Sequence, residues 1–133
     1  MTGPFANTFT DIETVDSKYL VLLLPFPPTV NALYAGGSKG RFKNKRYTKW
    51  EAEAHRTIRG QHLKHFSTPV SIVISYGRPD KRTRDVLNYD KAICDFLCHP
   101  SVSVLMDDSL IEKATVQWAD DVVGALIEIT EIP

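Results

Sequence analysis

The chain has 133 residues, a net charge of zero, 43% hydrophobic and 24% charged residues, which is typical of one globular domain and excludes a disordered or collagenous chain. Its longest apolar run, residues 19–28, is too short to cross a bilayer, which takes about 20 residues, so no membrane partner is expected. Acidic residues precede that run, where a secretory signal would be positively charged, and we therefore expect an intracellular protein.

The chain begins with a polar stretch and then a compact apolar one. Residues 1–17 are mixed and polar and are expected to form a flexible N-terminal leader. Residues 18–133 are expected to form a single domain. Within it, residues 19–24 are apolar and are followed by three prolines, which predicts a buried strand that stops at a rigid turn.

The next segment, residues 35–46, is rich in glycine and positive charge and lacks apolar periodicity. It predicts a mobile loop or an irregular hairpin. Thr48 and Glu51 have the spacing of a capping box, and apolar residues at helical spacing follow, so we predict a helix over residues 49–64. β-branched residues dominate residues 70–76 and predict a strand.

The second half of the chain adds one helix and several strands. A basic loop, residues 78–84, precedes Asp85, which is expected to cap a helix over residues 86–97. This order of elements predicts an α+β fold, a single domain with a mixed β-sheet and two main helices. Three strands are expected after the second helix: residues 102–106, 114–118 and 122–129, the last two paired as a hairpin.

Charge is balanced over the whole chain but not along it. Residues 39–91 carry fourteen basic and five acidic residues, a net charge of +9, and the two ends together carry −9. A protein that grips a polyanion with one face has such a distribution. A basic surface that contacts only solvent has it too, so charge alone leaves both interpretations open.

Five aspartates lie in the segment from Asp85 to Asp108 and favour a metal site. Asp107 and Asp108 follow an expected strand and would lie beside the start of the second helix, because consecutive elements usually neighbour one another in space. A ligand set made only of oxygens selects hard cations such as Mg²⁺ or Mn²⁺, which nucleases bind with carboxylates and substrate phosphate. Each aspartate taken alone is more often a helix cap or a solvated turn residue.

Four short motifs follow one another along the chain: LPFPPTVN at residues 24–31, RYTK at residues 46–49, RPDKRTRDVLNYDKAICDFL at residues 78–97 and DDSLI at residues 107–111. In this order and spacing they resemble the RusA family of Holliday-junction resolvases, whose central motif is P-D-[KR]-x-x-R-D-x-D-N-x-x-K. The resemblance covers nearly the whole domain and leaves only the leader unmatched.

This resemblance implies a fold, an activity and several site residues. It implies a homodimeric endonuclease of RusA-like fold that needs Mg²⁺, with Mn²⁺ as a substitute, and resolves four-way DNA junctions by paired symmetric nicks in recombination and repair. By position, Asp85 and Asp108 match two metal-binding catalytic aspartates, Asp107 accompanies the latter, and Lys91 matches the important helix lysine. Family members are often phage-borne, which would place the protein in a bacterial or phage-infected cell.

The third catalytic aspartate of the family is missing, because Leu87 occupies its position. Residues three apart on a helix share a face, so with Leu87 turned inward the Asp90 carboxylate would replace the lost ligand. We therefore expect Asp90 to be both catalytic and metal-binding. Two alternatives stay open: Asp90 is an exposed residue paired with a lysine, or the protein is a weakened or inactive junction-binding protein.

Basic side chains of the two loops would contact phosphates and position DNA without reading its sequence. Lys91 would steady the scissile phosphate or the charge that develops as the bond breaks, unless it is a plain surface lysine. Cys94 and Cys98, one helical turn apart, favour reduced core residues over a metal site with His99. The expected DNA-binding residues are Lys39, Arg41, Lys43, Lys45, Arg46, Arg78, Lys81, Arg82 and Arg84.

Overall fold

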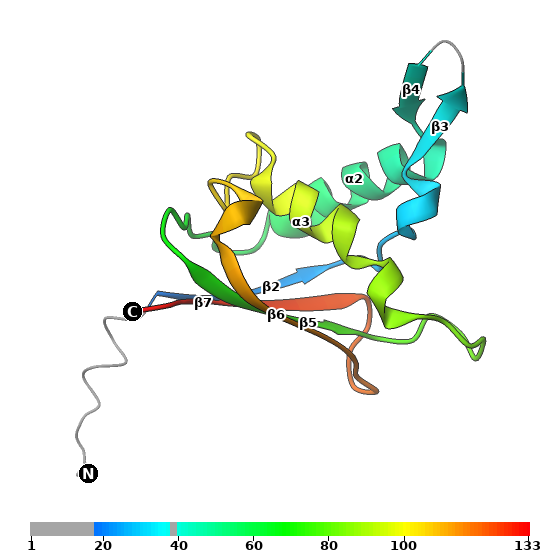
Figure 1. Cartoon of the computed structure of the whole chain (residues 1–133). Helices are drawn as coiled ribbons and strands as arrows, with labels where there is room; N and C mark the ends of the chain where they lie inside the picture. The colour runs from blue at the N-terminus through cyan, green and yellow to red at the C-terminus, as the bar shows by residue number, and fades with distance from the viewer. Residues whose placement is uncertain (1–17, 38–39) are drawn as a thin grey trace.

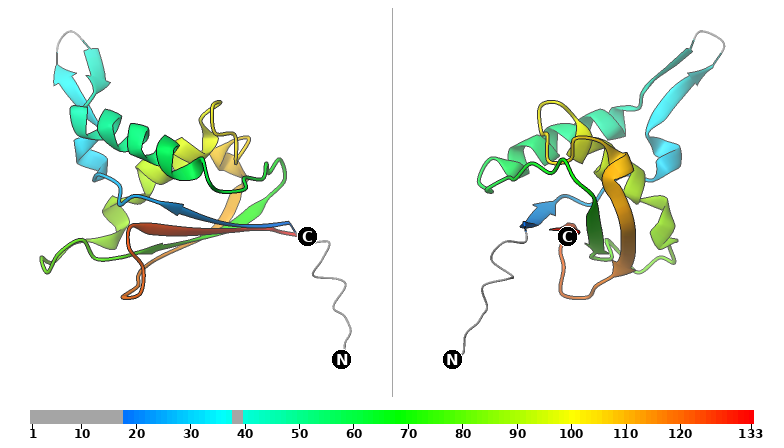
Figure 2. Two further views of the ribbon diagram at one scale, coloured as in Figure 1. Left: turned by 180° about the vertical axis from the view of Figure 1, so that it is seen from behind. Right: turned by 60° about the vertical axis from the view of Figure 1, so that its left-hand side comes forward.

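Four strands form one sheet, and both α-helices cover the same face of it (Figures 1 and 2). The computed structural model describes residues 18–37 and 40–133, so the expected leader and Lys39 lie outside the described residues. A separate two-stranded hairpin projects from the start of the first helix. The elements are β2 (Tyr19–Leu24), η1 (Val30–Ala32), β3 (Tyr34–Gly37), β4 (Gly40–Lys43), α2 (Lys45–Ile58), β5 (Val70–Tyr76), η2 (Val86–Asn88), α3 (Asp90–Cys98), η3 (Asp108–Leu110), β6 (Ile111–Trp118) and β7 (Ala125–Glu131).

The sheet is mixed, with strand order β2-β7-β5-β6. Strand β5 pairs with β6 in parallel and with β7 in antiparallel orientation, while β2 pairs with β7 at the edge. Parallel neighbours need a long crossover connection, and here it contains α3. The predicted α+β fold, with one mixed sheet and two main helices, is confirmed.

Strand β2 begins and ends where the sequence predicts, but it is an edge strand rather than a fully buried one. Leu20, Leu22 and Leu24 point into the core, because side chains alternate across a strand. The intervening side chains stay nearly half exposed on the face that the helices leave uncovered: Tyr19, Val21 and Leu23. The apolar run therefore overstated the burial of this strand.

Helix α2 begins earlier and ends earlier than predicted. Its N-cap is Asn44, whose side chain accepts a hydrogen bond from the Arg46 N–H at 2.8 Å. Thr48 is an interior residue whose hydroxyl donates to the Asn44 carbonyl, so the predicted capping box was wrong. The helix buries Tyr47, Trp50, Ala54 and Ile58, a stripe at helical spacing that packs on the sheet.

The predicted hairpin of the last two strands was wrong. Strand β5 lies between β6 and β7 and pairs with both, so these consecutive strands do not pair with each other. Every second residue of β5 from Val70 to Tyr76 is fully buried, and a central position protects this apolar strand better than an edge would. The segment between β6 and β7 therefore crosses the end of β5.

The predicted strand over residues 102–106 was also wrong. This segment is a loop whose Val104 and Leu105 N–H groups both donate to the Leu97 carbonyl, with a single parallel bridge between Phe66 and Leu105. Val102, Val104 and Leu105 are buried all the same, while Met106 is exposed. A short apolar run predicts that side chains are buried, but it does not determine whether the backbone that buries them is a strand or a loop.

Candidate active site and nucleic-acid interface

All the predicted metal and catalytic residues lie on the crossover that joins β5 to β6. After β5 the chain forms the basic loop of residues 78–84, which we call the arginine loop, and then η2 and α3. It returns to the sheet through η3, which lies against α3, while η2 lies against β6. One connection, whose path from β5 through α3 to β6 can be followed in Figure 1, thus carries both the aspartates and the cations of the arginine loop.

Asp85 caps a short 3-10 turn rather than a long helix. Its carboxylate accepts the Leu87 N–H at 3.0 Å and is exposed to solvent. The predicted helix over residues 86–97 is divided, because α3 begins only at Asp90. Asp85 is therefore a cap, as predicted, with a second carboxylate oxygen that accepts no hydrogen bond from the described residues.

Leu87 points outward, contrary to the prediction. Its side chain is 67% exposed, because the buried Tyr89 and the half-buried Val86 pack against the protein instead. Since the helix is interrupted at Tyr89, the argument that residues 87 and 90 share one helical face was wrong. The position that an aspartate occupies in the family motif is thus at the surface.

Asp90 is the first residue of α3 and is half buried. Its charge acts on two buried groups, the Tyr76 hydroxyl and the Cys94 thiol. Burial raises the pKa of Cys94 to about 12, with Asp90 adding to the effect. Burial, again with Asp90, raises the pKa of Tyr76, whose hydroxyl has no hydrogen-bond partner among the described residues. Asp90 therefore lies close enough to both groups to act on them electrostatically.

Lys91 forms an ion pair with Asp95 one helical turn later, with Nζ 3.1 Å from the carboxylate oxygen. This hydrogen bond raises the pKa of Lys91, and the charge of Asp108 contributes to the rise. Lys91 therefore lies within electrostatic reach of one of the family-motif aspartates. Sequence reasoning gave Asp95 no role, although its i,i+4 spacing from Lys91 is a recognisable signal for a helical ion pair.

Asp107 and Asp108 begin the 3-10 turn η3. The Asp107 carboxylate accepts hydrogen bonds from the Ser109 hydroxyl and backbone N–H, and these bonds lower the pKa of Asp107. Asp108 is exposed, and no described residue forms an ion pair with it. Burial raises the pKa of Cys98, the last residue of α3, to about 11, with Asp108 and then Asp107 adding to the effect, and η3 lies against α3.

Asp90, Asp95 and Asp108 all add to the raised pKa of Cys94, but the described residues build no closed metal site. Within residues 18–37 and 40–133, no three His, Cys, Asp or Glu side chains are grouped so that they could hold a metal ion. Mg²⁺ usually needs only one or two protein carboxylates together with water and substrate phosphate. Asp85 and Asp108 are both exposed, and neither forms an ion pair with a described residue.

Arg84 in the arginine loop is already paired. Its Nη2 lies 2.6 Å from Asp80, its Nη1 donates to the Tyr89 hydroxyl at 3.4 Å, and its side chain is only 20% exposed. Arg82 also contacts Asp80, yet it remains 77% exposed. Of the predicted DNA contacts in this loop, Arg82 and the exposed Lys81 are therefore more accessible to phosphates than Arg84.

Arg78 begins the arginine loop and stacks on an aromatic cluster. Its guanidinium lies 4.6 Å from the centre of the Trp118 ring, a cation–π contact. Trp118 packs with Tyr76 and Tyr89, and Tyr89 also accepts from Arg84. Both ends of the arginine loop are thus attached to the same cluster.

The β3–β4 hairpin carries the second group of predicted DNA contacts. Arg41 stacks over Tyr34, with 4.6 Å between the guanidinium and the ring centre. Lys43 pairs with Glu51 of α2 at 3.0 Å, and the neighbouring Phe42 is 63% exposed. Lys43 is therefore a link between the hairpin and the helix, in addition to being a cation at the surface.

Lys45 and Arg46 occupy the first turn of α2, which contains no acidic residue. Positive charge at a helix N-terminus opposes the helix dipole and costs stability. The same position attracts phosphate, because free N–H groups and the dipole favour an anion there. This unfavourable placement is explained if an anion binds beside the two exposed side chains.

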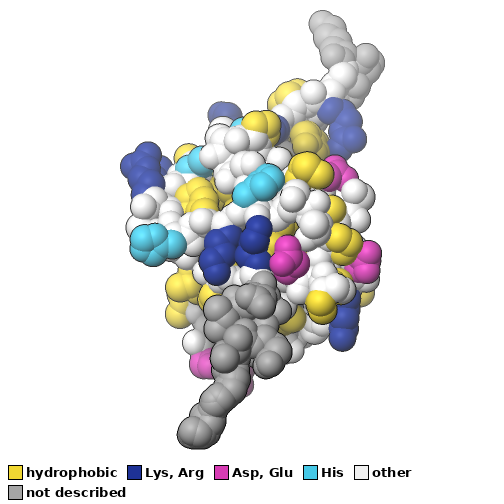
Figure 3. Space-filling model, turned by 90° about the vertical axis from the view of Figure 1, so that its left-hand side faces the viewer, with side chains coloured by type: hydrophobic (Ala, Val, Ile, Leu, Met, Phe, Trp, Pro, Cys, Tyr) yellow, Lys and Arg dark blue, Asp and Glu magenta, His cyan; other side chains and the backbone are white. Residues whose placement is uncertain are grey.

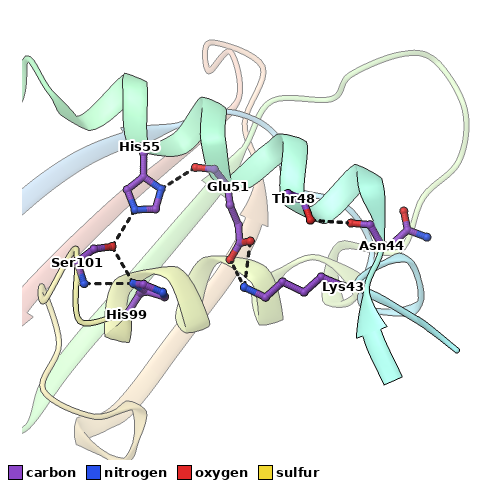
Figure 4. A network of polar contacts seen from close by, with 7 residues as sticks. All are labelled: Lys43, Asn44, Thr48, Glu51, His55, His99 and Ser101. Atoms are coloured by element: carbon purple, nitrogen blue, oxygen red, sulfur yellow. Dashed lines mark hydrogen bonds and ion pairs between the residues drawn. The ribbon is translucent and has the colours of Figure 1, made fainter. Parts of the chain in front are cut away.

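A polar network joins α2 to the loop after α3 (Figure 4). His55 contacts the Glu51 carbonyl at 2.8 Å and the Ser101 hydroxyl at 2.9 Å, and that hydroxyl contacts His99 Nδ1 at 2.7 Å. Glu51 in turn holds Lys43. The histidines therefore have structural partners, and the half-buried Cys94 and Cys98 are free thiols, as predicted.

Positive charge is not spread evenly over the surface. On the side seen in Figure 3, Lys and Arg side chains form separate groups among apolar, histidine and acidic ones. The arginine loop lies toward the opposite side of the molecule, and the hairpin projects from the top (Figure 1).

Comparisons with known proteins agree with this arrangement. The family described as "Endodeoxyribonuclease RusA" matches residues 25–130, more than three quarters of the chain. A search of the curated proteins found no match. None of the described helices is both long and apolar enough to span a membrane. The match includes the arginine loop, α3 and η3 with all their aspartates, and the chain therefore belongs to the RusA family of endodeoxyribonucleases.

Proposed function

We propose that this protein is a metal-dependent endonuclease that resolves four-way DNA junctions by paired symmetric nicks, in recombination and repair within a bacterial or phage-infected cell. One observation carries the proposal. In a member of an endodeoxyribonuclease family, the exposed Asp85 and Asp108 lie on one crossover connection with the cations of the arginine loop. Carboxylates beside phosphate-binding cations are what a metal-dependent nuclease requires.

The proposed metal ion is Mg²⁺, with Mn²⁺ as a substitute. Its proposed ligands are the carboxylates of Asp85, Asp90, Asp107 and Asp108. When bound, such an ion activates water and stabilises the leaving oxygen of the phosphodiester. Asp90 is included because its carboxylate is half buried and adds, as Asp108 does, to the raised pKa of Cys94 on α3. Leu87 contributes no ligand.

Lys91 is the proposed cation of the reaction centre. Its ammonium stays protonated at neutral pH, because the hydrogen bond to Asp95 raises the Lys91 pKa further. A fixed positive charge beside the scissile phosphate stabilises the charge that develops in the transition state. Asp95 is the positioning residue that holds Lys91 on the surface of α3.

DNA would bind along the two basic segments, through phosphate contacts that position the junction without reading its sequence. We expect two protomers, because two nicks on a two-fold symmetric junction require two active sites related by that symmetry. The proposed contacts are Lys39, which lies outside the described residues, Arg41, Lys43, Lys45 and Arg46 in the hairpin and the start of α2, and Arg78, Lys81 and Arg82 in the arginine loop. Arg84, a contact expected from the sequence, is instead held by Asp80.

One observation favours a second candidate function. Leu87 presents an exposed apolar side chain where the family motif has a catalytic aspartate. A sparse Mg²⁺ site that loses a negative ligand is weakened. The protein would then bind branched DNA without cutting it.

Cleavage of a labelled mobile four-way junction distinguishes the two functions. Purified protein is assayed with Mg²⁺, with Mn²⁺ and with a chelator, beside Asp85→Asn, Asp90→Asn and Asp108→Asn. Asp120→Asn, in the turn between β6 and β7, is the matched control. Resolution predicts paired nicks that need the metal and each site aspartate but not Asp120. Tight, salt-sensitive binding without nicks in either metal would establish the second function.

A further inference from the structure

Asp80 makes more polar contacts than any other carboxylate of the crossover connection. Its Oδ1 accepts from the Arg82 N–H at 3.0 Å and from Arg84 Nε at 3.2 Å. Its Oδ2 accepts from Arg82 Nε at 3.2 Å and from Arg84 Nη2 at 2.6 Å. One carboxylate thus binds two guanidinium groups and one backbone N–H of the same short loop.

These bonds extend from Asp80 to both ends of η2. Arg84 is the residue before Asp85 in the chain. Its Nη1 donates a hydrogen bond to the hydroxyl of Tyr89, the residue before Asp90. Tyr89 is buried in the aromatic cluster that also receives Arg78. Asp80 therefore acts, through Arg84, on the segment that places two proposed metal ligands.

The electrostatics of the loop agree with this arrangement. Residues 78–84 contain four cations and one acidic residue, so Asp80 supplies the only negative charge within the loop that offsets the mutual repulsion of its cations. The side-chain hydrogen bond from Arg84, together with the Arg82 N–H, holds the pKa of Asp80 well below its usual range. Asp80 is therefore ionised at every pH at which the enzyme would work.

We propose that Asp80 is the positioning residue of the arginine loop: it orders the loop, withholds Arg84 from DNA, and so fixes the segment that carries Asp85 and Asp90. The inference rests on the proposed function for its effect on cleavage. Its structural part, the ordering of the loop, stands apart from that function. A Coulombic role alone and a positioning role predict different effects of Asp80→Asn on the cleavage rate.

If Asp80 only offsets charge, Asp80→Asn makes the loop more basic and improves DNA binding without harming catalysis. If Asp80 positions the loop, the same variant releases Arg82 and Arg84, binds duplex more tightly and cuts a bound junction more slowly. Asp121→Asn is the matched control. Its turn lies beside the start of the arginine loop, since Val122 and Arg78 line one pocket, and it removes the same charge without touching the two arginines.

The experiment measures Kd for a four-way junction and for linear duplex, and the single-turnover cleavage rate at saturating protein. For Asp80→Asn we expect the cleavage rate to fall about tenfold or more, because small displacements of catalytic groups are costly. Junction Kd should stay within about threefold, and the preference for junction over duplex should decrease. Asp121→Asn should retain the wild-type rate and preference. An unchanged rate and preference in Asp80→Asn would overturn the proposal.

Limited trypsin digestion supplies a readout that needs no DNA and no nuclease activity. Cutting after Lys81 and Arg82 should be several-fold faster in Asp80→Asn than in the wild type or Asp121→Asn, because a released loop opens more often. Equal digestion would overturn the proposal, whatever the cleavage result. If the wild type cuts no junction in either metal, the proposed function fails. The role of Asp80 is then still decided by two readouts, the rate of trypsin digestion and the ratio of the Kd values for junction and duplex. A thermal unfolding curve confirms that each variant is folded.

Discussion

The two basic segments of this protein are held in different ways. The arginine loop is attached at both ends to one aromatic cluster and is tied internally by Asp80. The β3–β4 hairpin projects from the domain and is fixed near its base, by the Lys43–Glu51 ion pair and by Tyr34 packing on Tyr47. If the proposed function holds, the difference teaches that two basic segments of one chain can serve two tasks, precise placement beside the carboxylates and reach along the DNA.

The largest effect should come from the ordered segment, at Lys91. Lys91→Gln should lower the single-turnover cleavage rate about 100-fold, because it removes a fixed charge from the transition state. Asp95→Asn should lower the same rate about tenfold, since it removes only the ion pair that positions Lys91. Both rates are measured at saturating protein, and junction Kd should change little. Equal losses in the two variants would contradict a supporting role for Asp95.

Changes near the hairpin should alter the affinity for junction DNA but not the cleavage rate at saturating protein. Lys45→Gln combined with Arg46→Gln should weaken junction binding about tenfold at low salt and reduce the salt dependence, because two phosphate contacts are lost. The same variant should be more stable by about 0.5 kcal/mol, because charge that opposes the α2 dipole is removed. Binding titrations and chemical unfolding measure the two changes. Unaltered affinity would exclude this helix start from the interface.

Leu87→Asp tests whether a carboxylate at position 87, beyond the arginine loop, strengthens the proposed magnesium site. Because Leu87 is 67% exposed, the change should alter the free energy of unfolding by less than about 0.5 kcal/mol. We expect the Mg²⁺ concentration for half-maximal cleavage to fall several-fold, since a negative oxygen ligand is added to a sparse site. A magnesium titration of the cleavage rate measures this. Leu87→Asn is the control without the charge.

The smallest effect concerns Asp107 and pH. Hydrogen bonds from Ser109 lower the pKa of Asp107 in the folded state. A carboxyl group with a lowered folded pKa stabilises the protein above its unfolded pKa and loses that contribution as pH falls through the folded value. The stability advantage of the wild type over Asp107→Asn should therefore be present at pH 7 and decrease below about pH 4. Thermal unfolding of both proteins at pH 7 and pH 3 tests the sign.

Local signals in the sequence determined much of this protein. Asp85 as a cap, β5 over residues 70–76 and the prolines that end β2 were all predicted, because capping, strand preference and chain breaking depend on neighbouring residues. The ordered motifs indicated the family, and they also located the aspartates on one connection. The fold class followed from the order of the elements.

Only the tertiary structure decided which distant segments meet. It placed β5 between β6 and β7, turned Leu87 to solvent, and paired Arg84 with Asp80 rather than leaving it for phosphate. Strand order depends on how the whole sheet buries its apolar faces, and this involves residues dozens of positions apart. The pairing of a surface arginine depends on the path of its loop in space, which short-range patterns in the sequence do not specify.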